Sequence, residues 1–230
     1  MIIPARNEEG EIARSIRRAR MALGPETEII VVDGGSSDNT ARMACRHATV
    51  LRAQPSRGAQ LRRGAAVASG RVLVFLHADT WLPPDAGDRI RAALGAGAGS
   101  GCFRFGLRGG KSFARRLLEL SVNWRSRTFA TATGDQAIFA SRATYDACGG
   151  HPPLPLFDDL AFVKAARRTA PFVVLGSAAL TSPRRWETRG FWRTVAEHWF
   201  YRLAWTAGVS PHRLARSYYG EPASARGDRP

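Results

Sequence analysis

The stretch E-I-I-V-V-D-G-G-S-S-D-N-T, residues 28–40, joins a continuous apolar run to an abrupt polar turn. Its first half has the length and the β-branched residues of a strand that is buried on both faces. Asp33 ends the run, and the two glycines that follow allow the backbone to turn sharply or to approach a ligand closely. The stretch predicts a central strand of an α/β sheet, with its polar end at the edge where open sheets bind ligands.

The same pattern recurs on both sides of this stretch. I-I-P-A-R-N-E (2–8) and V-L-V-F-L-H-A-D-T (72–80) are also apolar runs that end in polar residues. Helical spacing of apolar residues follows the first run and precedes the second, at 12–23 and 57–68. This alternation predicts an α/β protein with a single Rossmann-like, mostly parallel mixed sheet and helices on both faces. Because M-I-I is short for a central strand, we expect the native chain to begin a few residues earlier.

The second half of the chain supplies further elements of both kinds. A glycine-rich joint at 93–101 precedes an alternating strand at 102–107 and an amphipathic helix near 112–124. Four more segments are expected, namely strands at 134–142 and 172–175 and helices at 158–169 and 191–205. Gly208 and Pro211 break the last of these helices.

Length and composition indicate one large domain. The chain has 230 residues, of which 44% are hydrophobic, and we expect a domain over 1–219 followed by a disordered polar tail at 220–230. No window reaches the roughly 18 uninterrupted apolar residues of a membrane-spanning helix. The opening residues lack the apolar segment of a secretory signal, and three scattered cysteines form neither a disulfide framework nor a metal knuckle. These features predict a cytoplasmic protein.

The formal net charge is +15, from 34 Lys and Arg residues against 19 Asp and Glu residues. A surplus of this size attracts phosphates, nucleic acids or anionic lipids. No zinc finger, helix-turn-helix or stacking-aromatic strand pattern accompanies it, so we do not expect a nucleic acid partner. The helix at 191–205 combines aromatic residues with arginines. That pattern fits peripheral contact with the inner face of a membrane, packing on the domain, or a homodimer interface.

His77 and Asp79 lie two residues apart at the end of an apolar run. On an extended chain both side chains point to the same face, with Ala78 pointing away. Imidazole and carboxylate ligands suit Mn²⁺ or a similar divalent cation, which could bridge the two phosphates of a nucleotide. The alternative is a core histidine followed by a loop acid. The role of Asp33 also has two interpretations. It could accept a hydrogen bond from a base or a ribose, or it could simply end a turn.

Four segments of the first half together resemble the nucleotide-sugar half of the inverting family-two glycosyltransferases, which have the GT-A fold: I-I-P-A-R-N-E, V-V-D-G-G-S-S-D-N-T, R-G-A-Q-L-R-R-G and F-L-H-A-D-T. Three segments of the second half resemble the acceptor segments of that family: G-D-Q-A-I-F-A-S-R (134–142), G-G-H-P-P-L-P-L-F-D-D (149–159) and S-P-R-R-W (182–186). Over residues 2–219, the pattern is similar to a small bacterial branch, the arsenosugar-biosynthesis-type glycosyltransferases.

The resemblance implies a nucleotide-sugar-binding half at 1–95, an acceptor and catalytic half at 100–190, and a C-terminal amphipathic helical segment at 191–219. The residues that would line the nucleotide are Pro4, Ala5, Arg6, Asn7, Glu8, Asp33, Arg57 and Asp79. Asp79 corresponds to the last acid of a D-x-D metal motif. The first acid of that motif is replaced here by His77, which leaves the requirement for Mn²⁺ or Mg²⁺ open.

The resemblance also implies an inverting displacement, with Asp159 as the general base and Asp158 as a second catalytic acid or the cap of the following helix. Contacts with the acceptor or the diphosphate would come from Asp135, Gln136, Arg184 and Arg185. The expected reaction is transfer of a sugar from a nucleotide-diphosphate donor, a UDP-sugar, to a small-molecule or lipid-linked acceptor.

Two other classes of protein stay open. A sugar-phosphate nucleotidylyltransferase uses a similar sheet but needs a glycine-rich phosphate loop with a lysine, and residues 2–20 contain no lysine. A non-catalytic nucleotide-sugar-binding protein would have no need of Asp158 and Asp159, or of Arg184 and Arg185.

Overall fold

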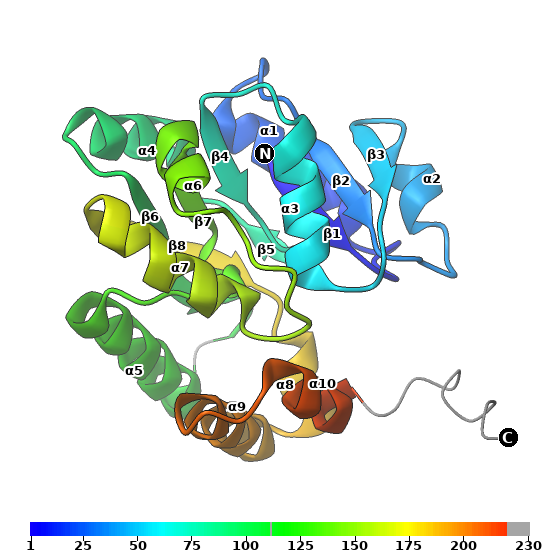
Figure 1. The fold of residues 1–230 in the computed structure, drawn as a ribbon. Helices are drawn as coiled ribbons and strands as arrows, with labels where there is room; N and C mark the ends of the chain where they lie inside the picture. Colours follow the sequence, from blue (N-terminus) through cyan, green and yellow to red (C-terminus); the bar gives the residue numbers. More distant parts are fainter. Residues whose placement is uncertain (111, 220–230) are drawn as a thin grey trace, which may run out of the picture.

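The computed structural model describes residues 1–110 and 112–219, so the tail expected at 220–230 lies outside the described residues. Within them, eight strands form one mixed sheet in the order β3-β2-β1-β4-β7-β6-β8-β5 (Figure 1). The strands are β1 Ile2–Ala5, β2 Ile30–Asp33, β3 Thr49–Arg52, β4 Val72–Phe75, β5 Thr80–Trp81, β6 Ser100–Leu107, β7 Ile138–Ser141 and β8 Phe172–Thr181.

The helices lie between these strands and after the last of them. They are α1 Ile12–Leu23, α2 Thr40–Ala44, α3 Arg57–Val67, α4 Ala86–Gly95, α5 Phe113–Phe129, the 3₁₀ turn η1 Gly134–Gln136, α6 Arg142–Ala147, α7 Asp158–Thr169, α8 Arg184–Arg189, α9 Phe191–Thr206 and α10 Pro211–Tyr219. No helix in the described part of the chain is long and apolar enough to cross a bilayer.

The expected α/β fold with a mixed sheet is confirmed. Strands β3, β2, β1 and β4 are parallel, whereas β7 is antiparallel to both β4 and β6. Ala5, Asp33 and Arg52 lie in register across β1, β2 and β3. The carboxyl ends of these strands therefore meet at one edge of the sheet, as the Asp33 stretch predicts.

Two hydrophobic cores, one on each face of the sheet, explain the continuous apolar runs. Because successive side chains of a strand point to opposite faces, Ile3 packs toward α1 and α4 while Ile2 packs toward α3 and α7. In α1, the fully buried Ile12 and Ile16 lie four residues apart and so share one face of the helix. Burying each such side chain contributes about 1.5–3 kcal/mol.

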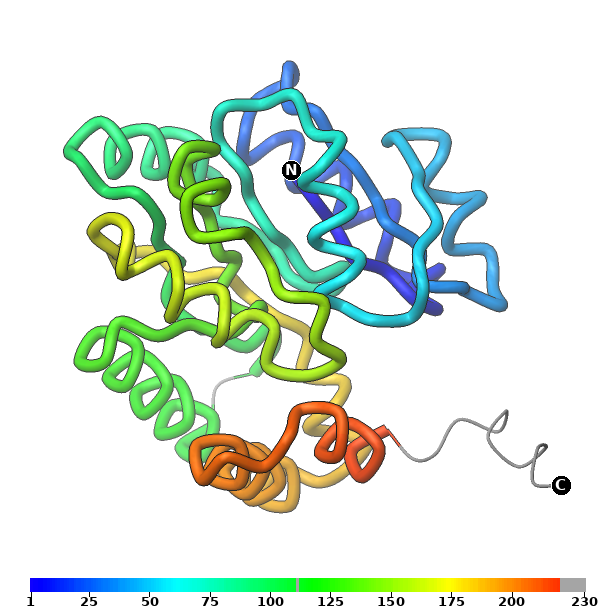
Figure 2. Tube along the Cα trace, viewed as in Figure 1, coloured from blue at the N-terminus to red at the C-terminus, as the bar shows by residue number. Residues whose placement is uncertain are grey.

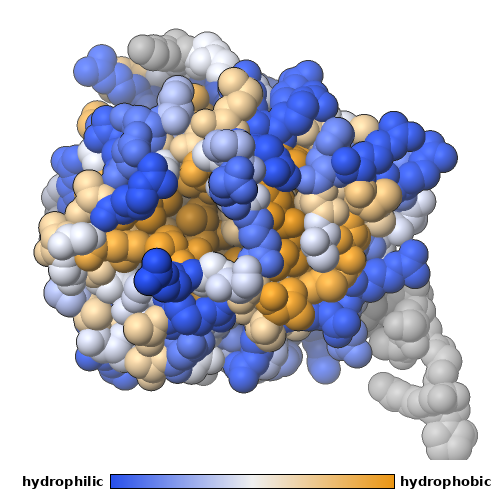
Figure 3. All heavy atoms as spheres, turned by 90° about the horizontal axis from the view of Figure 1, so that it is seen from above, coloured by the Kyte–Doolittle hydropathy of each residue, from blue (hydrophilic) through white to orange (hydrophobic). Residues whose placement is uncertain are grey.

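The C-terminal helices gather at the end of the molecule toward which β1 and β4 run. Helices α5, α8, α9 and α10 lie together there, and the chain trace shows how far apart in sequence they are (Figure 2). Trp186 of α8 packs with Phe105 and Leu107 of β6 and with apolar residues of α5 and α9. Figure 3 views the opposite end, where hydrophilic side chains surround a hollowed apolar area.

Two expected strands have clearly different bounds: the strand expected at 134–142 covers only Ile138–Ser141, after the turn η1, and β8 is longer than expected. Strand β8 continues from Phe172 to Thr181 instead of ending at 175, because its partner β6 continues to pair with it through a β-bulge. Helix α10 lies within the helical segment expected at 191–219, and Pro211, expected to break the preceding helix, also begins this one. Pro211 is the first residue of α10, where proline is tolerated because its missing N–H has no helical partner.

Candidate active site

The loops that follow β1 and β2 are fastened to each other at the edge of the sheet. The backbone N–H of Asn7 donates to Ser36 Oγ at 3.0 Å, and Asn7 Oδ1 accepts from the Ser37 N–H at 2.9 Å. The N–H of Glu8 donates to Thr40 Oγ1 at 2.7 Å. Asn7 reaches its partners from a left-handed backbone conformation, with φ at 56°. Two polar segments far apart in the sequence thus form one wall.

Asp33 lies in this wall and is 3% exposed. Its carboxylate accepts hydrogen bonds from the backbone N–H of Ser36, at 3.2 Å, and from the Ser36 hydroxyl. Behind it, Gln60 Nε2 donates to Val32 O at 2.7 Å and to Ala5 O at 3.2 Å, bracing the ends of β1 and β2. In this structure Asp33 stabilises its own turn, so contact with a base would require Ser36 to share or release it.

Glu8 is joined across the edge to the C-terminal part of the chain. Arg184 Nη2, from the first residue of α8, donates to both carboxylate oxygens of Glu8 at 2.9 Å. Burial raises the pKa of Glu8, while the bond from Arg184 opposes the rise and the charge of Asp79 adds to it. Arg184, Glu8 and Asp79 therefore lie within electrostatic reach of one another. Arg185 instead lies over the Tyr218 ring, 5.3 Å from its centroid.

The remaining residues predicted to line the nucleotide lie at this same edge. Pro4 and Ala5 belong to β1, and Ala5 is buried. Arg6 follows β1 and is exposed, and Arg57 is the first residue of α3.

The expectation that His77 and Asp79 share a face of an extended chain is wrong. The two residues lie in a tight turn closed by a hydrogen bond from Thr80 N–H to His77 O at 3.1 Å. His77 Nδ1 lies 3.0 Å from Asp135 Oδ1, whereas Asp79 Oδ1 lies 3.5 Å from Thr181 Oγ1. The two side chains diverge because the chain turns from β4, in the middle of the sheet, to β5 at its edge.

His77 does not fit the role of a metal ligand in this arrangement. Its Nδ1 is engaged by Asp135, and its Nε2 is buried without a hydrogen-bond partner among the described residues. A Cβ atom added to Gly134 would lie 2.0 Å from that nitrogen, so backbone already occupies the space in front of it. Both nitrogens face protein atoms rather than an open coordination site.

Asp79 does fit a divalent cation that is shared with a substrate. Its carboxylate is partly exposed, and its hydroxyl neighbours Thr80 and Thr181 lie at 3.4 and 3.5 Å, too far for strong hydrogen bonds. Among residues 1–110 and 112–219, no three His, Cys, Asp or Glu side chains gather to hold an ion by themselves. Mg²⁺ is commonly held by one or two carboxylates together with water and phosphate oxygens.

Three acids and an arginine gather on the other side of His77. Asp158 and Asp159 open α7, where negative charge is favourable, and Asp135 lies in η1. Burial opposes a higher pKa for Arg57, but Tyr219 and these three acids raise it. Arg57 thus lies within electrostatic reach of all three acids.

The two acids of α7 have different surroundings. Asp158 is 1% exposed, and its Oδ2 has no hydrogen-bond partner among the described residues. Burial first, and then the charge of Asp159, raise the pKa of Asp158 to about 7, against the effect of Arg57. Asp159 Oδ2 accepts from the Gly134 N–H at 2.8 Å, and its Oδ1 accepts from the Leu160 N–H at 2.7 Å.

The two predicted site residues of η1 differ in their exposure to solvent. The side chain of Asp135 is 36% exposed. Burial alone would raise the pKa of Asp135. The hydrogen bond with His77, followed by the charges of His77 and Arg57, outweighs burial and holds the pKa of Asp135 well below its usual range. Gln136 is fully buried, and its amide donates to Phe103 O at 3.2 Å and to Ser126 Oγ at 3.1 Å. The expectation that Gln136 contacts a ligand is therefore wrong in this structure, because its amide is used to hold β6 and α5.

The sheet edge and the loops after β1 and β2 lie within the part of the chain that matches a known protein family. Residues 1–145 match the family model described as Glycosyl transferase family 2. The chain belongs to glycosyl transferase family 2.

Solved structures share this fold. The TarS 1–349 structure from S. aureus superposes with a TM-score of 0.64 and 17% identity, over 79% of this chain and 60% of that one. The same protein in complex with UDP-GlcNAc gives 0.63 and 17%, over 79% and 57%. Glucosyl-3-phosphoglycerate synthase from Mycobacterium tuberculosis, in complex with Mn²⁺, UDP and phosphoglyceric acid, gives 0.58 and 23%, over 78% and 69%. At these identities the likeness confirms the GT-A fold.

Sequence inspection of this family 2 chain missed two arginines beside Asp159. Arg125 of α5 and Arg202 of α9 both lie close enough for the charge of Asp159 to affect their pKa. They come from two helices that are distant in sequence, and the sequence pattern of these helices indicates only their apolar faces. The high arginine content was the available signal, but it does not distinguish these two residues from the others.

Proposed function

We propose that this protein is an inverting glycosyltransferase that moves a sugar from a UDP-sugar to an acceptor hydroxyl, with Asp159 as the general base. One observation carries the proposal. Asp79, within electrostatic reach of Glu8 and Arg184, lies two residues along the chain from His77. His77 contacts Asp135 of η1, and the N–H of the adjacent Gly134 donates to Asp159 at the start of α7. A donor group and an acceptor group in one place are what a direct displacement needs.

The donor side is supported by the wall formed by the loops after β1 and β2. The hydrogen bonds of Asn7, Glu8 and Asp33 hold this wall in place at the carboxyl ends of the strands, where open sheets bind ligands. Arg184 brings positive charge toward the place of a diphosphate. TarS has been solved with UDP and with UDP-GlcNAc, which favours a uridine nucleotide for this chain as well.

Asp79 is the residue that would hold a divalent metal, Mn²⁺ or Mg²⁺. Such an ion neutralises charge on a departing diphosphate. The M. tuberculosis synthase has been solved with each of these ions together with UDP. His77 would have a different part, which is to hold Asp135 by the 3.0 Å contact at Nδ1.

On the acceptor side, Asp159 would take the proton of the acceptor hydroxyl as its oxygen attacks the anomeric carbon. The bond from that carbon to the diphosphate oxygen breaks on the opposite face, which inverts the configuration. The two N–H groups that donate to Asp159 fix its carboxylate in place. Burial and the charge of Asp159 raise the pKa of Asp158 to about 7, which makes it a weaker candidate for the group that takes the acceptor proton than its neighbour.

The test is a kinetic comparison of three proteins over a panel of UDP-sugars, with donor hydrolysis as the readout where no acceptor is supplied. We expect Asp159→Asn to lower turnover by about 10²-fold or more while UDP still raises the melting temperature. Asp88→Asn is the matched control, because that carboxylate lies on the exposed face of α4. Near-normal turnover by Asp159→Asn would remove the assignment of the base.

Four further expectations belong to this proposal. They are membership of the arsenosugar-type branch, a bacterial source, a cytoplasmic location, and peripheral membrane contact through 191–205. Each stays a prediction. Neither a nucleotidylyltransferase nor a non-catalytic binding protein is favoured by any contact at the site.

A further inference from the structure

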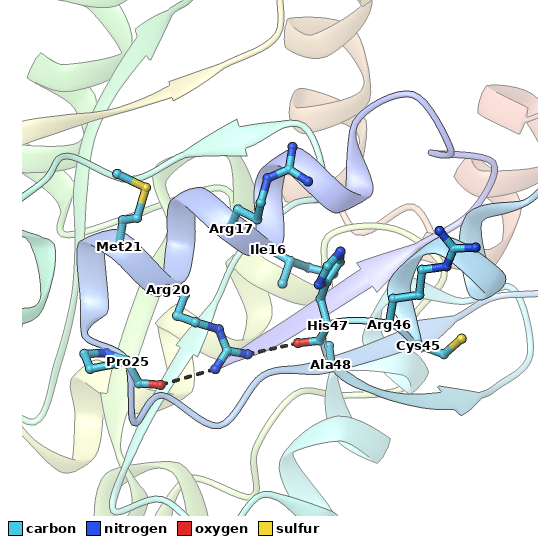
Figure 4. A pocket seen from close by; sticks show the side chains of 9 residues that line it. All are labelled: Ile16, Arg17, Arg20, Met21, Pro25, Cys45, Arg46, His47 and Ala48. Carbon is cyan, nitrogen blue, oxygen red and sulfur yellow. Dashed lines mark hydrogen bonds between the residues drawn. The ribbon is translucent and has the colours of Figure 1, made fainter.

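Two cavities stand out in the described part of the protein. The larger, of 790 Å³, is an open hollow between α1 and the segment after α2 (Figure 4). Its central guanidinium, on Arg20, is already bonded to the backbone oxygens of Pro25 and His47 at 3.2 and 2.9 Å. Its lining includes none of the site residues described above. That hollow is therefore stabilised by its own contacts and gives no indication of a ligand.

The second cavity, of 390 Å³, lies between α5, α7 and α9. Trp124 of α5 and Trp199 and Trp205 of α9 contribute aromatic rings to its walls. Leu160, the neighbour of Asp159 in α7, also lines it. The cavity is therefore apolar in large part and adjoins the acid that we propose as the general base.

Three arginines line this cavity; Arg167 donates to the backbone oxygens of Phe129 and Ala130, and the other two have fewer partners. Neither Arg125 nor Arg202 takes part in a salt bridge within the described residues, and Arg125 Nε is buried without a hydrogen-bond partner. Arg202 Nη2 donates to Thr131 Oγ1 at 3.3 Å, and within 1–110 and 112–219 its side chain makes no other hydrogen bond. Burial, and then the charge of Arg202, lower the pKa of Arg125 to about 10. Two partly buried like charges are costly unless an anion binds between them.

The mouth of the cavity continues into apolar surface on both flanking helices. On α5, the exposed residues Phe113, Leu117, Leu120 and Trp124 recur every three or four positions and so form one stripe. On α9, the exposed residues are Trp192, Trp199, Phe200 and Leu203. Contiguous exposed apolar surface of this kind is typical of a binding site for a ligand, a membrane or another protein.

We infer that the cavity between α5, α7 and α9 is the acceptor site, and that it takes a lipid phosphate, whose singly ionised phosphate group carries the acceptor hydroxyl that gives its proton to Asp159. Arg125 and Arg202 hold the phosphate, because guanidinium groups pair with phosphate oxygens in a bidentate manner. The apolar chain lies against Trp124 and Trp199 and follows the exposed stripes outward. This inference rests on the proposed function, since it assigns an acceptor to the same site, and it selects the lipid-linked class over small polar acceptors.

The test is a titration of the full chain with dodecyl phosphate, below the concentration at which it forms micelles. Binding is followed by intrinsic tryptophan fluorescence, because three tryptophans line the cavity. We expect a saturable change with dodecyl phosphate and little change with dodecyl maltoside, which has a neutral head group, or with inorganic phosphate, which has no chain. A saturating response to dodecyl maltoside at the same concentrations would overturn the inference.

Matched variants distinguish binding of dodecyl phosphate in the cavity from general attraction of its charge to a basic surface. Arg125→Gln should weaken the binding of dodecyl phosphate about ten-fold, the usual effect of losing one charge-assisted contact. Arg127→Gln removes the same charge from an exposed position of α5 outside the cavity lining and should leave binding unchanged. Equal weakening by the two variants, or by neither, would overturn the inference.

A further measurement keeps this result distinct from the proposed function. The melting temperature of each variant is recorded with and without UDP, which binds at the other side of the site. A normal UDP shift with no dodecyl phosphate binding overturns the acceptor inference alone. Saturable dodecyl phosphate binding with no response to any UDP-sugar overturns the donor assignment and leaves the lipid-phosphate cavity standing.

Discussion

Replacing Asp158 by asparagine should make the stability of this protein less sensitive to a rise in pH from 5 to 8. The Asp158 carboxyl group is almost fully buried, its Oδ2 lacks a hydrogen-bond partner among the described residues, and the Asp159 carboxylate is adjacent. Burial and that neighbour raise the pKa of Asp158 from 3.8 to about 7 in the folded protein. Folding therefore favours the protonated form of Asp158, and ionisation destabilises the folded state.

The expected size follows from the two pKa values. A rise from 3.8 to about 7 corresponds to about 4 kcal/mol. Because the folded pKa is the higher one, the contribution is complete below about pH 4 and is lost as the pH rises through 7. The wild type loses this stability between pH 4 and 8, whereas Asp158→Asn, which cannot ionise, keeps it.

The assay is urea denaturation of the wild type, Asp158→Asn and Asp88→Asn at pH 5 and pH 8. The Asp88 variant controls for the loss of one carboxylate, since its side chain is 81% exposed. Relative to the wild type, Asp158→Asn should gain roughly 2 kcal/mol or more in free energy of unfolding between pH 5 and pH 8. A difference that is the same at both pH values would show that Asp158 is ionised in the folded protein and that its environment has been misjudged.

Two other predictions concern the centre of the site. Gly134→Ala should lower the free energy of unfolding by about 2–4 kcal/mol, because the new Cβ would lie 2.0 Å from His77 Nε2, whereas Gly10→Ala, with nothing within 4 Å, should change it little; equal melting temperatures for the two variants would contradict the close packing. Asp79→Asn should abolish most of the increase in UDP affinity that Mn²⁺ produces, as measured by calorimetry with and without the ion, and an unchanged increase would place the ion elsewhere.

The sheet could be predicted from the sequence because each of its first strands is apolar on both faces. Ile2 and Ile3, or Ile30 and Val31, leave no solvent-facing side chain, and this pattern occurs where helices cover both faces. The strand ends could be predicted for the same reason, since polar residues follow each run. Helix α7 begins at Asp158 and ends at Thr169, as its spacing predicts.

Only those features of the site that depend on local sequence could be predicted. Two polar residues after a strand, such as His77 and Asp79, fit an extended segment or a turn equally well, and only the position of β5 beside β8 decides between them. A buried glutamine such as Gln136 looks like a ligand-binding residue until its partners are known. The cavity with Arg125 was out of reach, because it is formed by three helices whose approach is determined by packing rather than by their own sequences.

The contact between Glu8 and Arg184 has a consequence for synthesis of the protein. These residues are separated by 176 positions, and the ion pair closes the edge of the site between the start of the sheet and α8. A ribosome makes β1 long before it makes α8, so an unfinished chain can form the parallel strands while still lacking Asp159 and Arg184. We therefore expect nascent chains to be unable to consume activated sugar until their last helices have emerged.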